Sequence, residues 1–219
     1  MKKALIAGST GLVGKSLIEL LEKEDAYDEI HVLVRREVSS FSEKIHQHVV
    51  NFDQLDQFSL NTDIQDIYCC LGTTMKKAGS KEAFRKVDHD YVVNTARLGL
   101  RLNGQQFLVV SAIGADKDSS IFYNRVKGEM EEAVAQIGYP TVHIFQPSML
   151  DGDRGEFRFG EWLGSVFMKI TAPLWVGKLK NYKIIHADKV ALSMLKAAKE
   201  NRKGVTIHAS GEMNAVVTS

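Results

Sequence analysis

Three glycines between a short apolar segment and a helical pattern constrain this chain more than any other feature. The segment 8–14 reads Gly-Ser-Thr-Gly-Leu-Val-Gly; it follows a strand-like run at 3–7 and opens a helix expected over 12–23. In such a unit the first glycine permits a tight turn, the second a close approach of pyrophosphate, and the third helix packing. Amides at the helix start attract the phosphates. The pattern predicts a dinucleotide-binding loop made of Gly8, Ser9, Thr10, Gly11, Leu12, Val13 and Gly14.

Short apolar runs alternate with helical patterns along most of the remaining chain. Short apolar strands separated by helices are typical of a parallel sheet covered on both faces. Right-handed crossovers then give a doubly wound Rossmann fold of the α/β class. The expected strands are 30–35, 48–52, 66–71, 107–111, 141–145 and 205–209, and the expected helices are 80–102, 121–137 and 188–199.

The pattern changes after Pro147. Residues 151–160 are polar and rich in glycine, which favours a loop, and residues 161–170 predict a helix with apolar side chains such as Trp162 and Phe167. No linker or internal repeat divides the chain. We therefore expect one domain over 1–219, in which residues 148–219 contribute a small lobe on the substrate side.

Charge and cysteine content narrow the classes of partner. The chain of 219 residues has a net charge of +1, so nothing in its bulk charge favours nucleic acid or an anionic membrane. Its two cysteines, Cys69 and Cys70, are adjacent and fit a buried strand better than a disulfide or a metal site. The apolar run at the start is too short for a signal peptide, and no membrane span is expected. A cytoplasmic location is the resulting expectation.

The end of the second expected strand indicates which dinucleotide binds. Folds that bind NAD commonly place a carboxylate there for the ribose 2′-hydroxyl. This chain instead has Arg35 and Arg36, with Glu37 only after them. Guanidinium groups bind a 2′-phosphate through paired hydrogen bonds. The sequence thus predicts NADP(H) over NAD(H), with a solvated strand end as the alternative interpretation of the arginines.

Two further segments are candidates for cofactor contacts. Asp53 follows the third expected strand, where such folds often contact the adenine. The fourth expected strand ends in Leu71, Gly72, Thr73 and Thr74, and glycine permits a close approach of the backbone to a cofactor.

A tyrosine and a lysine four positions apart suggest the chemistry. Tyr123 and Lys127 share one face of an expected helix. A neighbouring ammonium group favours the phenolate and so lowers the pKa of a tyrosine toward the range of useful acids and bases. Ser111 ends the fifth expected strand, where its hydroxyl can polarise a substrate carbonyl. These residues predict a Ser-Tyr-Lys site.

Taken together, these segments resemble the atypical short-chain dehydrogenase/reductases, in particular the Tat-interacting-protein branch and its bacterial relatives. The glycine spacing, with two residues between successive glycines, is that of the extended and atypical members. The matching residues run in order through most of the chain: 8–14, 69–74, 76–79, 87–88, 111, 114–116, 123–129, 147–148 and 160–163.

The resemblance implies a Rossmann core, NADP(H) binding and a Ser-Tyr-Lys site, with Pro147 and Ser148 near the nicotinamide. Two positions depart from the pattern. Many relatives have Arg where this chain has Gln146, and many active members have Asn where it has Asp88, although Asn94 lies on the same expected helix. These departures put an Asn-dependent proton relay in doubt.

Three functions fit these residues. The first is hydride transfer between NADP(H) and a small carbonyl or alcohol. The second is a cofactor-binding regulator that acts through a protein partner, since several relatives are regulators, and a homodimer is also open. The third is nucleotide-sugar epimerisation or dehydration, which is disfavoured because only about 70 residues follow Pro147. No motif identifies a substrate or a metal ion.

Overall fold

Seven strands form a single parallel sheet. The computed structural model describes residues 1–38, 41–151, 184–200 and 202–217. Its main sheet has the order β3-β2-β1-β4-β5-β6-β9, and each neighbouring pair is parallel. The strands are β1 (Lys2–Ala7), β2 (Tyr27–Val34), β3 (Ile45–Val49), β4 (Asp66–Cys69), β5 (Gln106–Val110), β6 (Thr141–Gln146) and β9 (Gly204–Ala209). β7 (Leu150–Asp151) and β8 (Ile185–His186) form a separate parallel pair.

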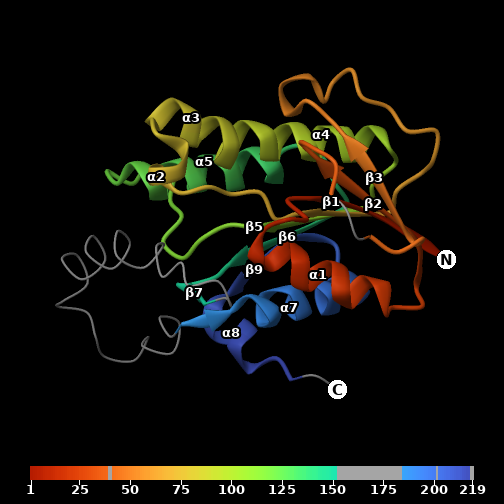
Figure 1. Ribbon diagram of the computed structural model, residues 1–219. Coiled ribbons are helices and arrows are strands. Elements are labelled where there is room, and N and C mark those ends of the chain that lie inside the picture. Colours follow the sequence, from red (N-terminus) through yellow and green to blue (C-terminus); the bar gives the residue numbers. More distant parts are fainter. Residues whose placement is uncertain (39–40, 152–183, 201, 218–219) are drawn as a thin grey trace.

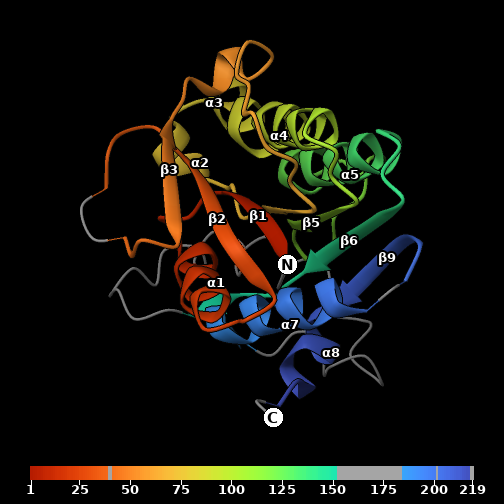
Figure 2. The same ribbon diagram turned by 90° about the vertical axis from the view of Figure 1, so that its right-hand side faces the viewer.

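Helices cover both faces of this sheet, as the sequence predicts. Figure 1 shows α1 (Leu12–Glu22) and α7 (Ala187–Lys199) on one face, and α4 (Tyr91–Arg101) and α5 (Phe122–Ala135) on the other. Figure 2 shows the same layers from the side. The shorter helical elements are η1 (Phe52–Gln54), α2 (Met75–Ala78), α3 (Lys81–Arg85), η2 (Lys86–Asp90) and α8 (Ser210–Ala215). Within the described residues, no helix is long and apolar enough to cross a membrane.

The apolar core has two halves, one on each side of the sheet. Leu17, Tyr68 and Met194 belong to the half under α1 and α7, and Ile67, Ala96 and Ile144 belong to the half under α4 and α5. Alternate residues of β4 enter opposite halves because successive side chains of a strand point to opposite faces. Burial on both faces explains why the central strands are almost wholly apolar in sequence.

The strand order reverses between β1 and β4. β2 and β3 lie beyond β1, whereas β5, β6 and β9 lie beyond β4. Ligands of doubly wound sheets bind at the carboxyl ends of the strands at such a switch point. The two strands stay joined just past this edge, where the Cys70 amide donates to the Ala7 carbonyl over 2.8 Å.

The structure also corrects some of the expected boundaries. The third strand covers Ile45–Val49 and not 48–52, and the helix expected over 80–102 is divided by the π-helical turn η2. Helices α2 and α8 were not expected. Of the loop expected over 151–160, only Asp151 is described, in β7, and the helix expected over 161–170 lies outside the described residues.

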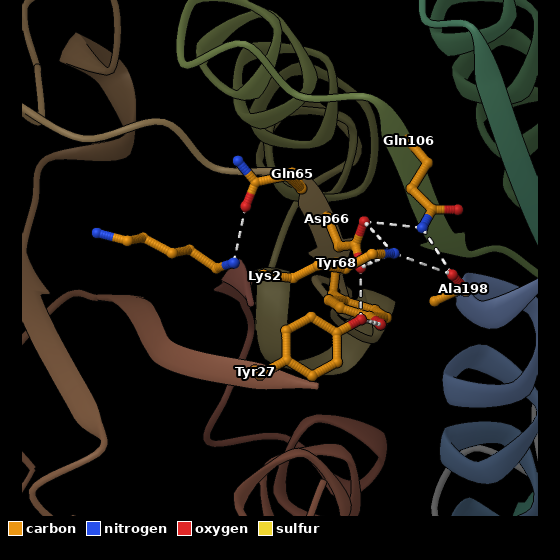
Figure 3. Close-up of polar contacts among 8 residues, drawn as sticks. Lys2, Tyr27, Gln65, Asp66, Tyr68, Gln106 and Ala198 are labelled. Carbon is orange, nitrogen blue, oxygen red and sulfur yellow. Dashed lines mark hydrogen bonds and ion pairs between the residues drawn. The ribbon is translucent and has the colours of Figure 1, made fainter. Parts of the chain in front are cut away.

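A buried polar cluster lies at the amino end of the central strands. Asp66 is 1% exposed and accepts hydrogen bonds from Tyr27, Gln106 and Lys2 (Figure 3). The Gln106 amide also donates to the Ala198 carbonyl of α7 over 2.9 Å. Because these side chains start from β1, β2, β4 and β5, the cluster joins four strands at the end opposite to the glycine loop.

Candidate cofactor and active site

The glycine loop folds as a compact turn that leaves no space for side chains at two of its glycines. Gly8 has a φ of +87°, and an added Cβ would lie 2.5 Å from the carbonyl carbon of Cys70. A Cβ at Gly14 would lie 2.2 Å from the Gly8 oxygen. Both distances are far below van der Waals contact, so these positions require glycine. The turn closes where the Gly11 amide donates to the Gly8 carbonyl over 3.1 Å.

This loop has donor groups suited to an anion. The hydroxyl of Ser9 is buried and has no hydrogen-bond partner among the described residues. Helix α1 begins directly after Gly11, which supplies no side-chain cap to the first amides. A buried hydroxyl without a partner is costly, and free amides at a helix start favour negative charge. The loop therefore fits the pyrophosphate of a dinucleotide.

The two arginines lie directly beyond the carboxyl end of β2. Arg35 and Arg36 are exposed, and neither forms an ion pair with any residue that the structure describes. Asp53 lies in η1, after β3, and its carboxylate is 2.8 Å from Nζ of Lys86. This ion pair lowers the pKa of Asp53 through the hydrogen bond from Lys86. The carboxylate thus links η1 to η2.

Asp88 connects the end of β4 with helix α5. It lies in η2 and is 1% exposed. Its Oδ2 accepts from the Thr73 amide over 2.8 Å, and its Oδ1 is 2.8 Å from Nζ of Lys127. Lys127 is itself only 3% exposed. A π-helical turn is frequent at functional sites because it redirects side chains within a helix. Here the buried carboxylate lies between the segment 71–74 and the expected active-site lysine.

Tyr123 occupies an aromatic environment one turn before Lys127. Its ring centroid lies 5.5 Å from that of Phe84, and the residue is 4% exposed. Burial, and after it the charge of Asp88, raises the pKa of Tyr123. The direction is the opposite of the one expected from the sequence. The reason is that Asp88 compensates the charge of Lys127 and that the ring is buried.

Ser111 follows β5 and is held by residues of β6 and α5. Its amide donates to the Phe145 carbonyl over 2.7 Å, and its hydroxyl donates to a carboxylate oxygen of Glu131. Nε2 of Gln146 lies 3.0 Å from each oxygen of the same carboxylate. Burial raises the pKa of Glu131, against the opposing effect of these hydrogen bonds and of Lys127.

The segment after β6 is linked to the segment after β5. The Pro147 carbonyl accepts from the Ile113 amide over 2.9 Å. Ser148 accepts from the hydroxyl of Ser210 in α8 over 2.9 Å. The carboxyl ends of β5 and β6 therefore form one connected edge, next to the end of β4.

The predicted residues thus fall into two linked groups. The segments 8–14 and 71–74 meet at the carboxyl ends of β1 and β4, while Lys127 joins this edge through Asp88. Ser111 instead contacts Glu131, which the sequence interpretation missed. A signal was available: Glu131 is four positions after Lys127, and residues at this spacing share one helix face.

Comparisons with known proteins place the chain in a family. Protein HTATIP2 of Rattus norvegicus is 35% identical over 178 residues, which cover 80% of this chain and 73% of that protein. The chain belongs to the atypical short-chain dehydrogenase/reductase family. A second relative, "Protein FMP52-1, mitochondrial" of Scheffersomyces stipitis, is 30% identical over 154 residues, covering 69% of this chain and 68% of that protein. The model of the NAD dependent epimerase/dehydratase family matches residues 4–112.

Solved structures of other proteins share the fold. The enzyme WbmH of Bordetella bronchiseptica, in complex with NAD+, has a TM-score of 0.69 at 13% identity, covering 96% of this chain and 76% of that chain. A short chain dehydrogenase family protein from Francisella tularensis has a TM-score of 0.67 at 14% identity, covering 97% and 98%. At these identities the likeness establishes the Rossmann fold.

Proposed function

We propose that the protein is an NADP(H)-dependent oxidoreductase acting on a small carbonyl or alcohol substrate through Ser111, Tyr123 and Lys127. The observation that carries this proposal is the double contact of Asp88. Its carboxylate binds Lys127 of α5 and the Thr73 amide at the end of β4. The lysine of the proposed site is therefore tied to the strand end at the topological switch point, where doubly wound folds bind dinucleotides.

The residues proposed to hold the cofactor are spread over five strand ends. They are Gly8, Ser9, Thr10, Gly11, Leu12, Val13 and Gly14 for the pyrophosphate, Arg35 and Arg36 for the 2′-phosphate, Asp53 for the adenine, and Leu71, Gly72, Thr73, Thr74, Pro147 and Ser148 nearer the nicotinamide. When bound, the nicotinamide supplies or accepts the hydride.

Residues of the chain bind the substrate oxygen and transfer its proton. Ser111 forms a hydrogen bond with that oxygen, and the Tyr123 hydroxyl gives it a proton in reduction and takes the proton back in oxidation. The ammonium of Lys127 stabilises the phenolate that remains after proton donation. Asp88 opposes this last effect, because its charge raises the pKa of Tyr123.

Two measurements test the assignment. NADPH oxidation followed by absorbance against a panel of aldehydes, ketones and quinones tests the reaction; turnover with one substrate class is expected. Calorimetric titration with NADPH and NADH tests the cofactor, and tighter NADPH binding is expected, reduced to the NADH level in the variant Arg35→Ala/Arg36→Ala. Equal binding of both cofactors by the unaltered protein contradicts the NADP(H) assignment.

A second candidate function is cofactor-dependent regulation through a protein partner. The raised pKa of Tyr123 favours it, because an acid with a high pKa transfers its proton less readily. Tight NADPH binding with no turnover across the panel would support this function. A third candidate function is epimerisation, which the description of the matching family suggests. Conversion of UDP-glucose by the protein with bound NAD would reveal it.

The location and the lobe are proposed on the sequence alone. We place the protein in the cytoplasm, and fractionation of cells tests this against the mitochondrial location in the name of the fungal relative. The proposed substrate lobe over 148–219 includes residues 152–183, which lie outside the described range.

A further inference from the structure

Glu131 is an ionisable group that the proposed Ser-Tyr-Lys scheme does not use. It lies on α5, one turn after Lys127, and its carboxylate contacts the ends of two strands. Ser111 donates its hydroxyl hydrogen to Oε1, and Gln146 donates its amide to both oxygens over 3.0 Å. The carboxylate is therefore hydrogen-bonded directly to Ser111, the residue proposed to bind the substrate oxygen.

This contact decides what Ser111 can offer to a substrate. A serine hydroxyl has one hydrogen and two acceptor lone pairs. While Glu131 is ionised it accepts that hydrogen, so Ser111 can only accept, as an alcohol substrate requires. Once Glu131 is protonated, its own O–H can donate to the Ser111 oxygen, and the serine hydrogen becomes available for a carbonyl oxygen.

We propose that Glu131 is a positioning residue whose protonation reverses the hydrogen bond to Ser111 and thereby adapts the site to carbonyl reduction. The inference rests on the proposed function, because it assumes that Ser111 binds the substrate oxygen. No proton passes from Glu131 to the substrate. The carboxylate takes up one proton from solvent, and the transferred proton of the reaction still comes from Tyr123.

The surroundings of Glu131 allow this change of protonation. Ser111, which follows β5, and Gln146 of β6 face it with uncharged groups. The cation acting on it from its own helix, Lys127, is already paired with Asp88 of η2. No ion pair to Glu131 occurs in the part of the chain that the structure describes. Burial raises the pKa of the carboxyl, which brings its titration closer to neutral pH.

The first test follows the carboxyl itself by carbon-13 NMR of protein labelled at the glutamate carboxyl carbon. The signal lost in Glu131→Gln identifies the residue. Ser111→Ala removes a donor to the carboxylate and should move its titration to higher pH. Gln146→Arg places a cation opposite the carboxylate and should move the titration to lower pH. An unchanged titration in both variants overturns the inference.

The second test measures NADPH-dependent reduction of 9,10-phenanthrenequinone against pH. In the unaltered protein, kcat/KM should fall about tenfold per pH unit above the titration of Glu131, because the protonated form is the active one. Glu131→Gln should remove this fall, since its amide is able to donate to Ser111 and does not titrate. Gln146→Arg should move the fall to lower pH. A Glu131→Gln profile identical to that of the unaltered protein overturns the inference.

The two tests separate the inference from the proposed function. If the unaltered protein reduces no quinone, the proposed function is contradicted. The NMR titration of the Glu131 carboxyl carbon then decides alone whether Glu131 and Ser111 are coupled. Thermal melting of each variant shows whether it is folded. If Glu131→Gln fails to fold, the pH profile of Gln146→Arg decides the kinetic test, and an unshifted profile there overturns the inference.

Discussion

Nζ of Lys127 lies 2.8 Å from Oδ1 of Asp88, and the two side chains are only 4% and 1% exposed. Removing two charges from water is costly, so a buried pair adds little net stability although breaking it by removing one partner is destabilising. The second oxygen of Asp88 holds the Thr73 amide. Because Asp88 also raises the pKa of Tyr123, this one carboxylate acts on both the lysine and the tyrosine of the proposed site.

Replacing Asp88 should change stability and the acidity of Tyr123 together. Asp88→Asn keeps an acceptor for Thr73 but leaves the Lys127 charge buried alone, which should cost about 3 kcal/mol of unfolding free energy. The pKa of Tyr123 should fall, because the neighbouring negative charge is gone. Urea unfolding and carbon-13 NMR of labelled tyrosine measure the two effects.

The controls for this variant are an exposed aspartate and a double replacement. Asp56→Asn, at an exposed position of the chain, should leave both quantities unchanged. Asp88→Asn combined with Lys127→Met should recover part of the lost stability, because no unpaired charge is left buried. Strictly additive losses in the double variant would show that the pair is not coupled.

Ser9→Ala should separate cofactor affinity from stability. The Ser9 hydroxyl has no partner among the described residues, so its removal should leave the melting temperature unchanged or slightly higher. Loss of a hydrogen bond to a charged phosphate, worth about 1.5–3 kcal/mol, should weaken NADPH binding at least about tenfold. Calorimetry measures the affinity, with Ser16→Ala in α1 as the control. Unaltered NADPH affinity in Ser9→Ala would remove this hydroxyl from the proposed site.

Asp66→Ala should have the opposite effects to Ser9→Ala: a loss of stability with unchanged NADPH affinity. It removes the acceptor shared by Tyr27, Gln106 and Lys2, so that each of these donors loses a hydrogen bond (Figure 3). Unfolding free energy should fall by about 3 kcal/mol. NADPH affinity of the folded protein should persist, because the cluster lies at the other end of the strands. Asp28→Asn, at an exposed position, is the matched control, and an equal loss of stability there would contradict the role of Asp66.

A pair of histidines between β6 and β9, of which His143 is buried, should make stability depend on pH. Nδ1 of His143 is 3.0 Å from Nε2 of His208, and burial lowers the pKa of His143 to about 4. The unfolded chain takes up this proton near pH 6.5, so stability is full above that pH. As the pH is lowered from 6.5 to 4, the unfolding free energy should fall by at most about 3 kcal/mol.

His143→Gln should reduce the slope of unfolding free energy against pH, whereas His186→Gln, at an exposed position, should not. Urea unfolding at successive pH values measures it. A slope that is the same in His143→Gln and the unaltered protein would exclude His143 as its source.

The sequence reveals the fold more completely than the site. The glycine loop and the apolar central strands carry strong local signals, and right-handed crossovers then give the doubly wound fold. β3 was misplaced because this edge strand is largely exposed, so its polar residues His46 and His48 gave no apolar run, while Val50 and Phe52 did. In an edge strand that is largely exposed, a run of apolar residues does not mark where the strand lies.

Contacts between distant segments explain what the sequence could not provide. The π-helical turn at Asp88 has no periodic signal of its own, because tertiary contacts with Lys127 and Thr73 hold the carboxylate inside. The pKa of Tyr123 is raised first by burial and then by the charge of the same carboxylate. Glu131 likewise becomes notable only once β5 and β6 bring Ser111 and Gln146 to it.

The central claim is that Tyr123 transfers a proton in an NADPH-dependent reaction, and Tyr123→Phe tests it most directly. The measurement is NADPH oxidation with the carbonyl substrate that the unaltered protein reduces fastest, alongside calorimetric NADPH affinity. Loss of general acid catalysis should lower turnover at least about 100-fold while NADPH binding stays the same. Turnover within about twofold of the unaltered protein, at unchanged affinity, would contradict the account.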